Sequence, residues 1–454
     1  MPTTCDRVVN FAASSTSPQY FLPSTVPASF LRLDNGLTLI HQEMPSVSVV
    51  SVDIWVKAGA NCDPVGFAGM AHFLEHMIFR GTEAIAAGEF DMVIESEGGD
   101  SQAATSHDYA HYALTVATEQ VTHTLPLLVE MLLNAKIDPR HLEQERLVVL
   151  EEIRRESDDP DWLAYQHLMH TAYGEHHPYG RSILGSIDTV EQITAEQMLE
   201  FHRSRYQPQC MTVAIAGAIS GEQALDLVNW AFSAADSPMT QGKQPTCIQE
   251  VSYTQPKSAP TIQRQTISLP QVQHSRLNLA WMGASVQNLQ EAIQLELLLT
   301  ILVEGRSARL VQQLQEERGW IHDIAGSFSI QEYASLFNIS AYLEASDLER
   351  VEHHIRQEII SLNTQLVSMN ELNRAKRSLC NSFIFALESP PQLANFLGYY
   401  GLLGCQDLCQ NWSSAYCEII SQTQPLDLQH LAQKYLTPDN YVVTRLIPEY
   451  GKSK

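Results

Sequence analysis

The order of apolar and polar positions predicts a chain built from short strands and longer helices. Residues 29–44 read SFLRLDNGLTLIHQEM, two alternating runs around the pair Asn35-Gly36. An Asn-Gly pair between two such runs is the strongest short-range signal for a β-hairpin. Further runs rich in β-branched residues predict strands at 47–59, 111–117 and 211–217.

Apolar residues that recur every three or four positions predict helices between these strands. In the first half of the chain they cover 118–137, 141–157 and 194–206. The second of these patterns stops at Asp158-Asp159-Pro160, because a proline cannot continue a helix from within.

Residues 236–262 carry four prolines and little periodicity, which is typical of an interdomain linker. Beyond them the order of elements repeats. Strands are expected at 275–283, 336–344 and 441–448, and helices at 289–305, 347–366 and 370–389, the last ended by Pro390-Pro391. The repeat predicts an α+β protein of two similar domains, each a mostly antiparallel sheet covered by helices. The expected parts are an N-terminal arm at 1–27, a first domain at 28–235, the linker, and a second domain at 263–454.

The composition is that of a globular protein with a strong negative charge. Apolar residues make up 44% of the chain, and 52 acidic residues against 28 basic ones give a net charge of −24. This charge argues against nucleic acid as a partner, because phosphates need a basic surface. The first 27 residues lack a basic start followed by an apolar run, and no stretch reaches the ~18 apolar residues of a membrane span. A cytoplasmic protein is therefore expected.

The segment GMAHFLEHMIFRGT, residues 69–82, places three ionisable groups in an otherwise apolar helix. Burial of such groups costs free energy unless something satisfies them. His72 and His76 are four apart and share one helix face, where two imidazoles can hold a Zn²⁺ ion at about 2.0–2.1 Å. Glu75 projects close to that face and can reach a water on the metal, the reverse of the HExxH zinc helix. The alternative is that backbone groups satisfy both histidines inside a core.

A catalytic zinc needs three protein ligands and an open position, and a later helix is the best source of the third ligand. Glu145 and Glu152 are seven apart, which places them two turns apart on one helix face. Leu147, Val148 and Leu150 are expected to supply apolar surface for the burial of this helix. Two carboxylates that face a buried environment need a cation there.

Together these motifs resemble the inverted-motif zinc metallopeptidases, a family that includes pitrilysin, insulin-degrading enzyme and the mitochondrial processing peptidases. The resemblance runs along nearly the whole chain from about residue 30. It includes LDNGLTLI, MAHFLEHMIFRGT, EGGDSQAATSHDYAHYALTV, ERLVVLEEIRRESDDP, HPYGRSILG and, in the second half, GRSARLVQQLQEERGW and ELNRAKRSL. It implies a clamshell of two domains around a cavity that admits peptides, with zinc in the first domain and a catalytically silent copy in the second.

The resemblance also implies a role for each motif residue. His72, His76 and Glu152 are expected as the ligands of one Zn²⁺ per chain, Glu75 as the general base, and Glu145 as an acidic residue that assists from behind the ligands. The implied function is zinc-dependent cleavage of peptides or unstructured segments. The net charge of −24 favours basic substrates.

Residues 98–106, GGDSQAATS, match a family segment that usually reads Gly-Gly-x-x-Asn-Ala-x-Thr. In the family this segment is an edge strand that receives substrate by strand addition. Gln102 stands where the family has Asn, while Ala103 and Thr105 are as expected. Because backbone groups do most of the pairing, we expect these three residues to bind substrate.

Gln315 and His322 are a more serious departure from the family. Active single-chain relatives carry an Arg and, seven residues later, a Tyr, which hold the substrate backbone. Neither Gln nor a neutral His replaces a permanent guanidinium. We therefore expect the metal-bearing subunit of a heterodimer whose homologous partner carries the Arg/Tyr pair. The alternatives are that Gln315 and His322 bind substrate themselves, for example in a homodimer, or that the chain is a non-catalytic structural or peptide-binding relative.

Other histidines give weaker signals. His107 and His111 have metal-ligand spacing only on a helix, and residues 105–116 alternate like a strand or a loop. His176 and His177 lie in a loop and are expected at the surface.

Overall fold

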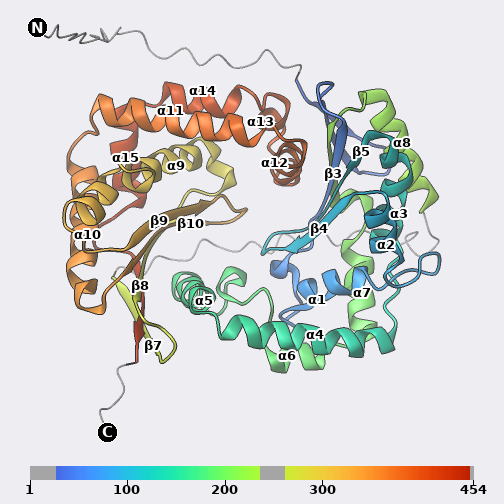
Figure 1. The fold of residues 1–454 in the computed structure, drawn as a ribbon, viewed down its shortest axis with the longest axis horizontal. Helices are drawn as coiled ribbons and strands as arrows, with labels where there is room; N and C mark the ends of the chain where they lie inside the picture. The colour runs from blue at the N-terminus through green and yellow to red at the C-terminus, as the bar shows by residue number, and fades with distance from the viewer. Residues whose placement is uncertain (1–26, 236–260, 450–454) are drawn as a thin grey trace, which may run out of the picture.

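Two β-sheets, one in each half of the chain, form the frame of the molecule (Figure 1). The computed structural model describes residues 27–235 and 261–449. The strands of the first sheet are β1 (Ser29–Arg32), β2 (Thr38–Glu43), β3 (Val49–Val56), β4 (Asp100–Thr105), β5 (Ala110–Ala117) and β6 (Met211–Gly217). Those of the second are β7 (Gln263–Leu269), β8 (Ser275–Gly283), β9 (Asp323–Ser329), β10 (Ser335–Leu343) and β11 (Val442–Pro448).

Both sheets are mostly antiparallel. The strand order is β1-β2-β6-β3-β5-β4 in the first sheet and β7-β11-β8-β10-β9 in the second. Within the described residues only β2–β6 and β7–β11 pair in parallel. Strands β4 and β9 lie at corresponding edges. The α+β class expected from the repeat is confirmed.

Helices pack against both sheets. In the first half they are α1 (Met70–Ile78), α2 (Glu89–Ser96), α3 (Val121–Leu133), α4 (Pro139–Ser157), α5 (Pro160–Tyr173), α6 (Ile187–Gln192), α7 (Ala195–Arg205) and α8 (Gly221–Ala234). In the second half they are α9 (Leu289–Val303), α10 (Leu348–Thr364), α11 (Met369–Ala386), α12 (Pro390–Leu402), α13 (Gln406–Gln410), α14 (Ala415–Gln422) and α15 (Pro425–Tyr435). In the described ranges no helix is both long and apolar enough to cross a bilayer.

Local sequence signals explain where several elements begin and end. The β1–β2 hairpin turns at Gly36, whose φ of 85° suits a residue without a side chain. Helix α4 ends before Pro160 and α11 before Pro390, as the breaker residues predict. Pro160 also starts α5, and Pro390 starts α12. Proline is tolerated there because the backbone N–H that it lacks has no partner in the first turn of a helix. The expected linker, apart from residues 261 and 262, and the arm up to residue 26 lie outside the described residues.

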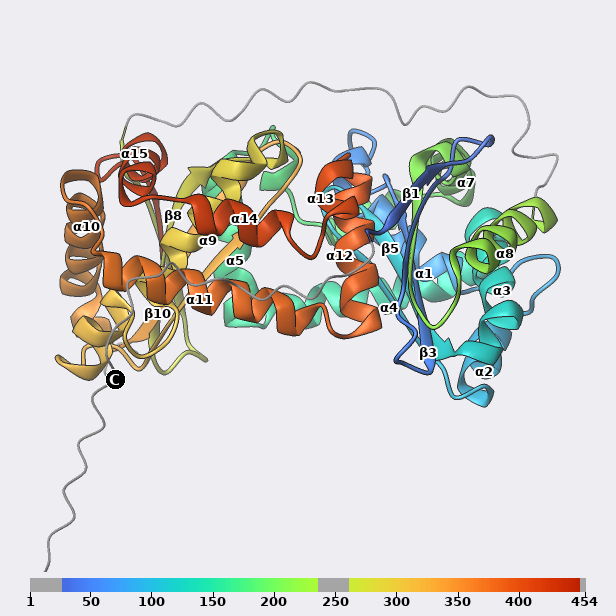
Figure 2. The same cartoon turned by 90° about the horizontal axis from the view of Figure 1, so that it is seen from above.

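One helix from each half packs against the sheet of the other half. Helix α5 lies on β8 and β11, and α12 lies on β3 and β6, as Figures 1 and 2 show. As a result Ile40 and Ala214 of the first sheet share a buried apolar cluster with Leu393 and Leu397 of α12. This exchange of helices between the halves fixes how the two sheets face each other.

Two glycines allow α12 to approach the first sheet closely. A Cβ on Gly398 would overlap the indole ring of Trp55, and one on Gly401 would overlap Ile40. Both neighbours are fully buried, so neither can turn into solvent to make room. The missing side chains therefore set the distance between the helix and the sheet.

We expect Gly398→Ala to lower the free energy of unfolding by about 1–3 kcal/mol, because overpacking forces α12 away from the sheet. The control is Gly221→Ala on α8, where the atom nearest to an added Cβ is His41 Nδ1 at an ordinary 3.5 Å. Urea denaturation of both variants measures the difference. Equal stabilities would contradict the close packing of α12.

Candidate metal centre

Helix α1 is held rigidly at its N-terminus. The Asp63 carboxylate accepts hydrogen bonds from the backbone N–H groups of Gly69 at 2.7 Å and Ala71 at 2.9 Å. These bonds satisfy donors that a helix start leaves unpaired. One face of α1 is fully buried, through Phe73, Leu74, Met77 and Ile78. The helix therefore presents His72, Glu75 and His76 in a fixed orientation.

Helix α4 packs against α1 through a different face from the one expected. Glu145 is only 3% exposed and lies on the buried face with Val149 and Leu150. Leu147 and Val148, expected to be buried, are 68% and 49% exposed. The expectation was wrong because residues 147 and 148 sit about 100° or more around the helix from Val149, which is fully buried.

His72, His76 and Glu152 converge between α1 and α4. Glu152 Oε2 lies 3.5 Å from His72 Nε2 and 3.3 Å from His76 Nε2, and the three donor atoms fall within 4.8 Å of one another. Tetrahedral zinc with bonds of about 2.0–2.1 Å separates its ligand atoms by about 3.3 Å. Two imidazoles and a carboxylate at these separations fit a zinc ion.

Glu145 supports this group from behind. His76 Nδ1 donates to Glu145 Oε1 at 2.9 Å, which leaves Nε2 of the same ring free to face Glu152. Such an outer hydrogen bond fixes the tautomer of a metal-binding histidine. The other oxygen of Glu145 pairs with Arg80, a residue that sequence reasoning missed although it lies four positions after His76.

Glu75 contacts the edge strand of the first sheet. The Thr105 hydroxyl, at the end of β4, donates to Glu75 Oε2 at 2.5 Å. Ala103 is half-buried on the same strand, and the exposed Gln102 side chain donates to Asp100 at 3.0 Å. The candidate base and the candidate substrate strand are thus in direct contact.

The histidines and carboxylates of the centre differ in their protonation. Burial, helped by the adjacent His76, lowers the pKa of His72 to about 4. Burial also opposes a proton on His76, but hydrogen bonds to Glu145 and Glu152 outweigh it and raise the pKa of His76 to about 9. The hydrogen bond with His76 lowers the pKa of Glu152, and burial raises the pKa of Glu75. His76 and Arg80 together therefore face the two carboxylates of α4.

Gln315 and His322 lie together in the second half of the chain. The Gln315 amide donates to the His322 backbone carbonyl at 2.8 Å, and His322 Nε2 lies 3.2 Å from Glu344. The hydrogen bonds of both side chains thus go to residues of the second half of the chain.

The remaining histidines have separate partners. His107 is buried and its Nε2 lies 3.2 Å from the Arg181 carbonyl, while His111 stacks on Trp55 and bonds Asp53. His177 was expected at the surface but is 7% exposed, because its ring stacks on Tyr173 and accepts a backbone hydrogen bond. His176 is exposed as expected.

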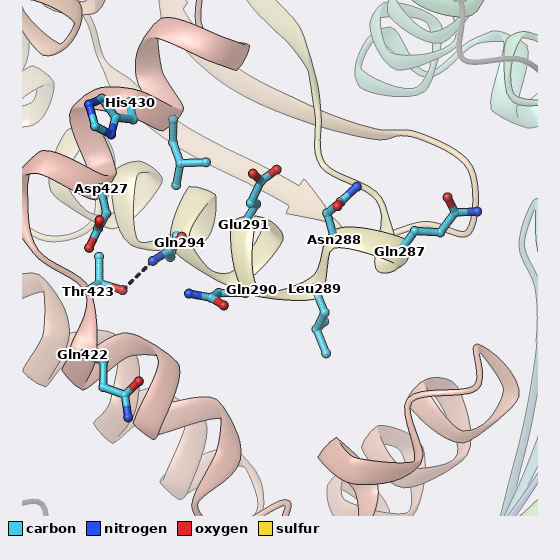
Figure 3. A pocket seen from close by; sticks show the side chains of 11 residues that line it. Gln287, Asn288, Leu289, Gln290, Glu291, Gln294, Gln422, Thr423, Asp427 and His430 are labelled. Carbon is cyan, nitrogen blue, oxygen red and sulfur yellow. Dashed lines mark hydrogen bonds between the residues drawn. The ribbon is translucent and has the colours of Figure 1, made fainter.

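A separate hollow of about 730 Å³ lies in the second half, between the start of α9 and helices α14 and α15 (Figure 3). Amide and carboxylate side chains line it, and Gln294 donates to Thr423 across one wall at 3.0 Å. Glu291 in this lining pairs with Lys434 at 2.7 Å. Its carboxylate is therefore already compensated.

Two family models match the chain. One, described as Insulinase (Peptidase family M16), matches residues 38–186, and the other, described as Peptidase M16 inactive domain, matches residues 192–379. The chain therefore belongs to the M16 family of peptidases, which confirms the resemblance seen in the motifs. The first match contains the group on α1 and α4, and the second contains Gln315 and His322.

Relatives along most of the chain carry peptidase names. A protein of Rickettsia bellii named as an uncharacterized zinc protease is 29% identical over 79% of this chain and 83% of its own length. A probable mitochondrial-processing peptidase subunit beta of Arabidopsis thaliana is 26% identical over 92% of this chain and 79% of its own. A solved protease from Helicobacter pylori has the same fold, with a TM-score of 0.85 at 24% identity over 93% of this chain and all of that one.

The geometry predicts how metal affinity depends on the α4 carboxylates. Glu152→Gln removes the charge of a proposed zinc ligand and should weaken zinc binding. Glu145→Gln releases the His76 ring, and this variant by itself should weaken zinc binding by about 10–100-fold. Competition with a chromophoric chelator measures the affinity. The control is Glu151→Gln on the exposed side of the same helix. Unchanged affinity in Glu152→Gln would contradict this assignment.

Proposed function

We propose that this chain is a zinc-dependent endopeptidase that cleaves peptides or unstructured segments. The observation that carries the proposal is the convergence of His72, His76 and Glu152, with Glu75 on the same helix and in contact with an edge strand. Membership of the M16 family and the names of the relatives support it.

In this proposal His72 Nε2, His76 Nε2 and Glu152 hold the ion, and Glu145 keeps the His76 ring in place. When bound, zinc supplies a Lewis acid that polarises a peptide carbonyl and makes water acidic near neutral pH. Helix α4 presents the half-buried Glu152 and the buried Glu145 to that charge, and the attraction is stronger there than in open water.

Glu75 acts as the general base. Thr105 occupies its Oε2, so Oε1 is the oxygen that takes a proton from the attacking water and returns it to the leaving amine. The Thr105 hydrogen bond also orients the carboxylate. A base held in one rotamer needs no reorganisation during the reaction.

Strand β4 provides the place for an extended substrate. It is one edge of the first sheet, and its backbone can pair with a peptide along Gln102, Ala103 and Thr105. Because Thr105 bonds Glu75, a peptide on this edge lies beside the base. The net charge of −24 favours peptides with basic residues.

We further propose that the active form is a heterodimer with a homologous subunit. Neither Gln315 nor His322 carries the permanent charge of a guanidinium, and the Gln315 amide already donates to the His322 carbonyl. The partner would supply the Arg and Tyr that this chain lacks. The alternatives, that Gln315 and His322 bind substrate themselves or that the chain binds peptides without cutting them, give different outcomes in the assay below.

Glu75→Gln should keep zinc and lose turnover, because an amide cannot accept the proton. The assay is cleavage of a quenched, unstructured, basic peptide, with metal content measured in parallel. Glu95→Gln, an exposed change on α2, is the control. Retained turnover in Glu75→Gln would rule out its role as base. A zinc-loaded wild-type chain that cleaves only after a homologous subunit is added would support the heterodimer, and full activity as a homodimer would count against it.

Substrate charge should affect the rate. We expect kcat/KM for a basic peptide to exceed that for an acidic peptide of equal length by tenfold or more at low salt, and the difference to shrink as salt screens the surface. Initial rates at two ionic strengths measure this. Equal rates for both peptides would contradict a basic preference while leaving the peptidase assignment intact.

A further inference from the structure

Three side chains at one end of the second sheet form another group of metal-donor atoms. His274 Nδ1 lies 2.9 Å from Glu344 Oε1, and His322 Nε2 lies 3.2 Å from the same oxygen. The three donor atoms fall within 4.8 Å of one another, which among the described residues is true of only one other group, the one on α1 and α4. The proposed peptidase mechanism uses neither His274 nor Glu344.

The register of the sheet places these residues side by side. Strands β8 and β10 pair as far as Ser275 and Leu343, so the next residue on each, a histidine and a glutamate, adjoin at the sheet end. The His322 backbone N–H donates to the Tyr342 carbonyl at 2.7 Å, which brings the start of β9 to the same row. The donors therefore flank the ends of three hydrogen-bonded strands, which hold their backbones side by side.

The group matches the one between α1 and α4 in composition and in the arrangement of its rings. Both contain two imidazoles and one carboxylate. The His274 and His322 rings lie 4.8 Å apart at 68°, and the His72 and His76 rings lie 4.8 Å apart at 70°. Contacts of 2.9 and 3.2 Å need only a small expansion to reach the separation of about 3.3 Å between ligands of tetrahedral zinc.

Neighbouring residues hold both histidines in place. The Tyr342 ring packs against His274 and His322, with ring centroids 5.1 and 5.5 Å away. Gln315 fixes the His322 backbone through its amide. The three donor side chains are 33%, 47% and 52% exposed in the order His274, His322, Glu344, so an ion can enter and leave from solvent.

We propose that His274, His322 and Glu344 form a second metal site that binds one Zn²⁺ or a similar divalent transition-metal ion. Because it is exposed, it binds more weakly than the centre on α1 and α4, and the ion exchanges with solvent. An ion there cross-links the ends of β8, β9 and β10. It also puts positive charge beside His322. This site does not depend on the proposed peptidase activity.

Zinc titration of the chelator-stripped chain against a competing chromophoric chelator tests the site. We expect about two zinc ions per chain for the wild type and about one for Glu344→Gln. His72→Ala/His76→Ala, which removes the other centre, should also bind about one, and the combined variant none. The control is His123→Ala, a 58% exposed histidine on α3 that pairs with Glu97. These stoichiometries are measured without turnover, so the outcome is distinct from a failure of the proposed function.

Chemical protection gives a second readout that leaves the proposed site itself unchanged. Zinc should slow carbethoxylation of His274 and His322 at least tenfold in His72→Ala/His76→Ala, as followed by peptide mass spectrometry, and leave His123 unaffected. A single zinc in the wild type, a second zinc that persists in Glu344→Gln, or equal modification of all three histidines with and without zinc would each overturn the proposal.

Discussion

The burial of Glu145 between α1 and α4 is the constraint on which the candidate centre depends. A carboxylate that is 3% exposed is costly unless it is paired, and its two oxygens are taken by His76 and Arg80. The bond to His76 decides which nitrogen of that ring faces Glu152. Removal of this one carboxylate would leave the half-buried His76 without a fixed tautomer and Arg80 without its partner.

The same helix connects the centre to the second half of the chain. Helix α4 carries Glu145 and Glu152. It ends at Ser157, and α5, which packs on the second sheet, begins at Pro160. At the start of α5, Asp161 pairs with Arg276 on β8. Arg276 also lies over the ring of Tyr342, which packs against His274 and His322. The two candidate metal groups are thus joined through a continuous series of contacts.

Sequence alone predicted the elements that depend on local pattern. The four-residue spacing of His72 and His76 and the seven-residue spacing of Glu145 and Glu152 translate directly into one helix face each, and the structure brings three of these four residues to one point. The hairpin at Gly36 and the breaks at Pro160 and Pro390 are equally local.

What the sequence could not provide were relations between distant segments. Leu147 and Val148 look like core residues by composition, but both are exposed, whereas Glu145 is buried on the helix that packs against α1. His177 is buried by aromatic neighbours whose proximity no periodicity reveals. The approach of His274, His322 and Glu344 depends on strand register, since 48 and 22 positions separate them along the chain.

The exchange of α5 and α12 has a consequence for how the protein comes apart. Each half of the chain holds a helix that covers the other half's sheet, and the glycines of α12 bring backbone and sheet into direct contact. The two fragments of a chain cleaved between residues 235 and 261 would therefore stay associated, because each fragment contains a helix that covers the sheet of the other. Dissociation of the fragments would expose apolar surface on both of them to water.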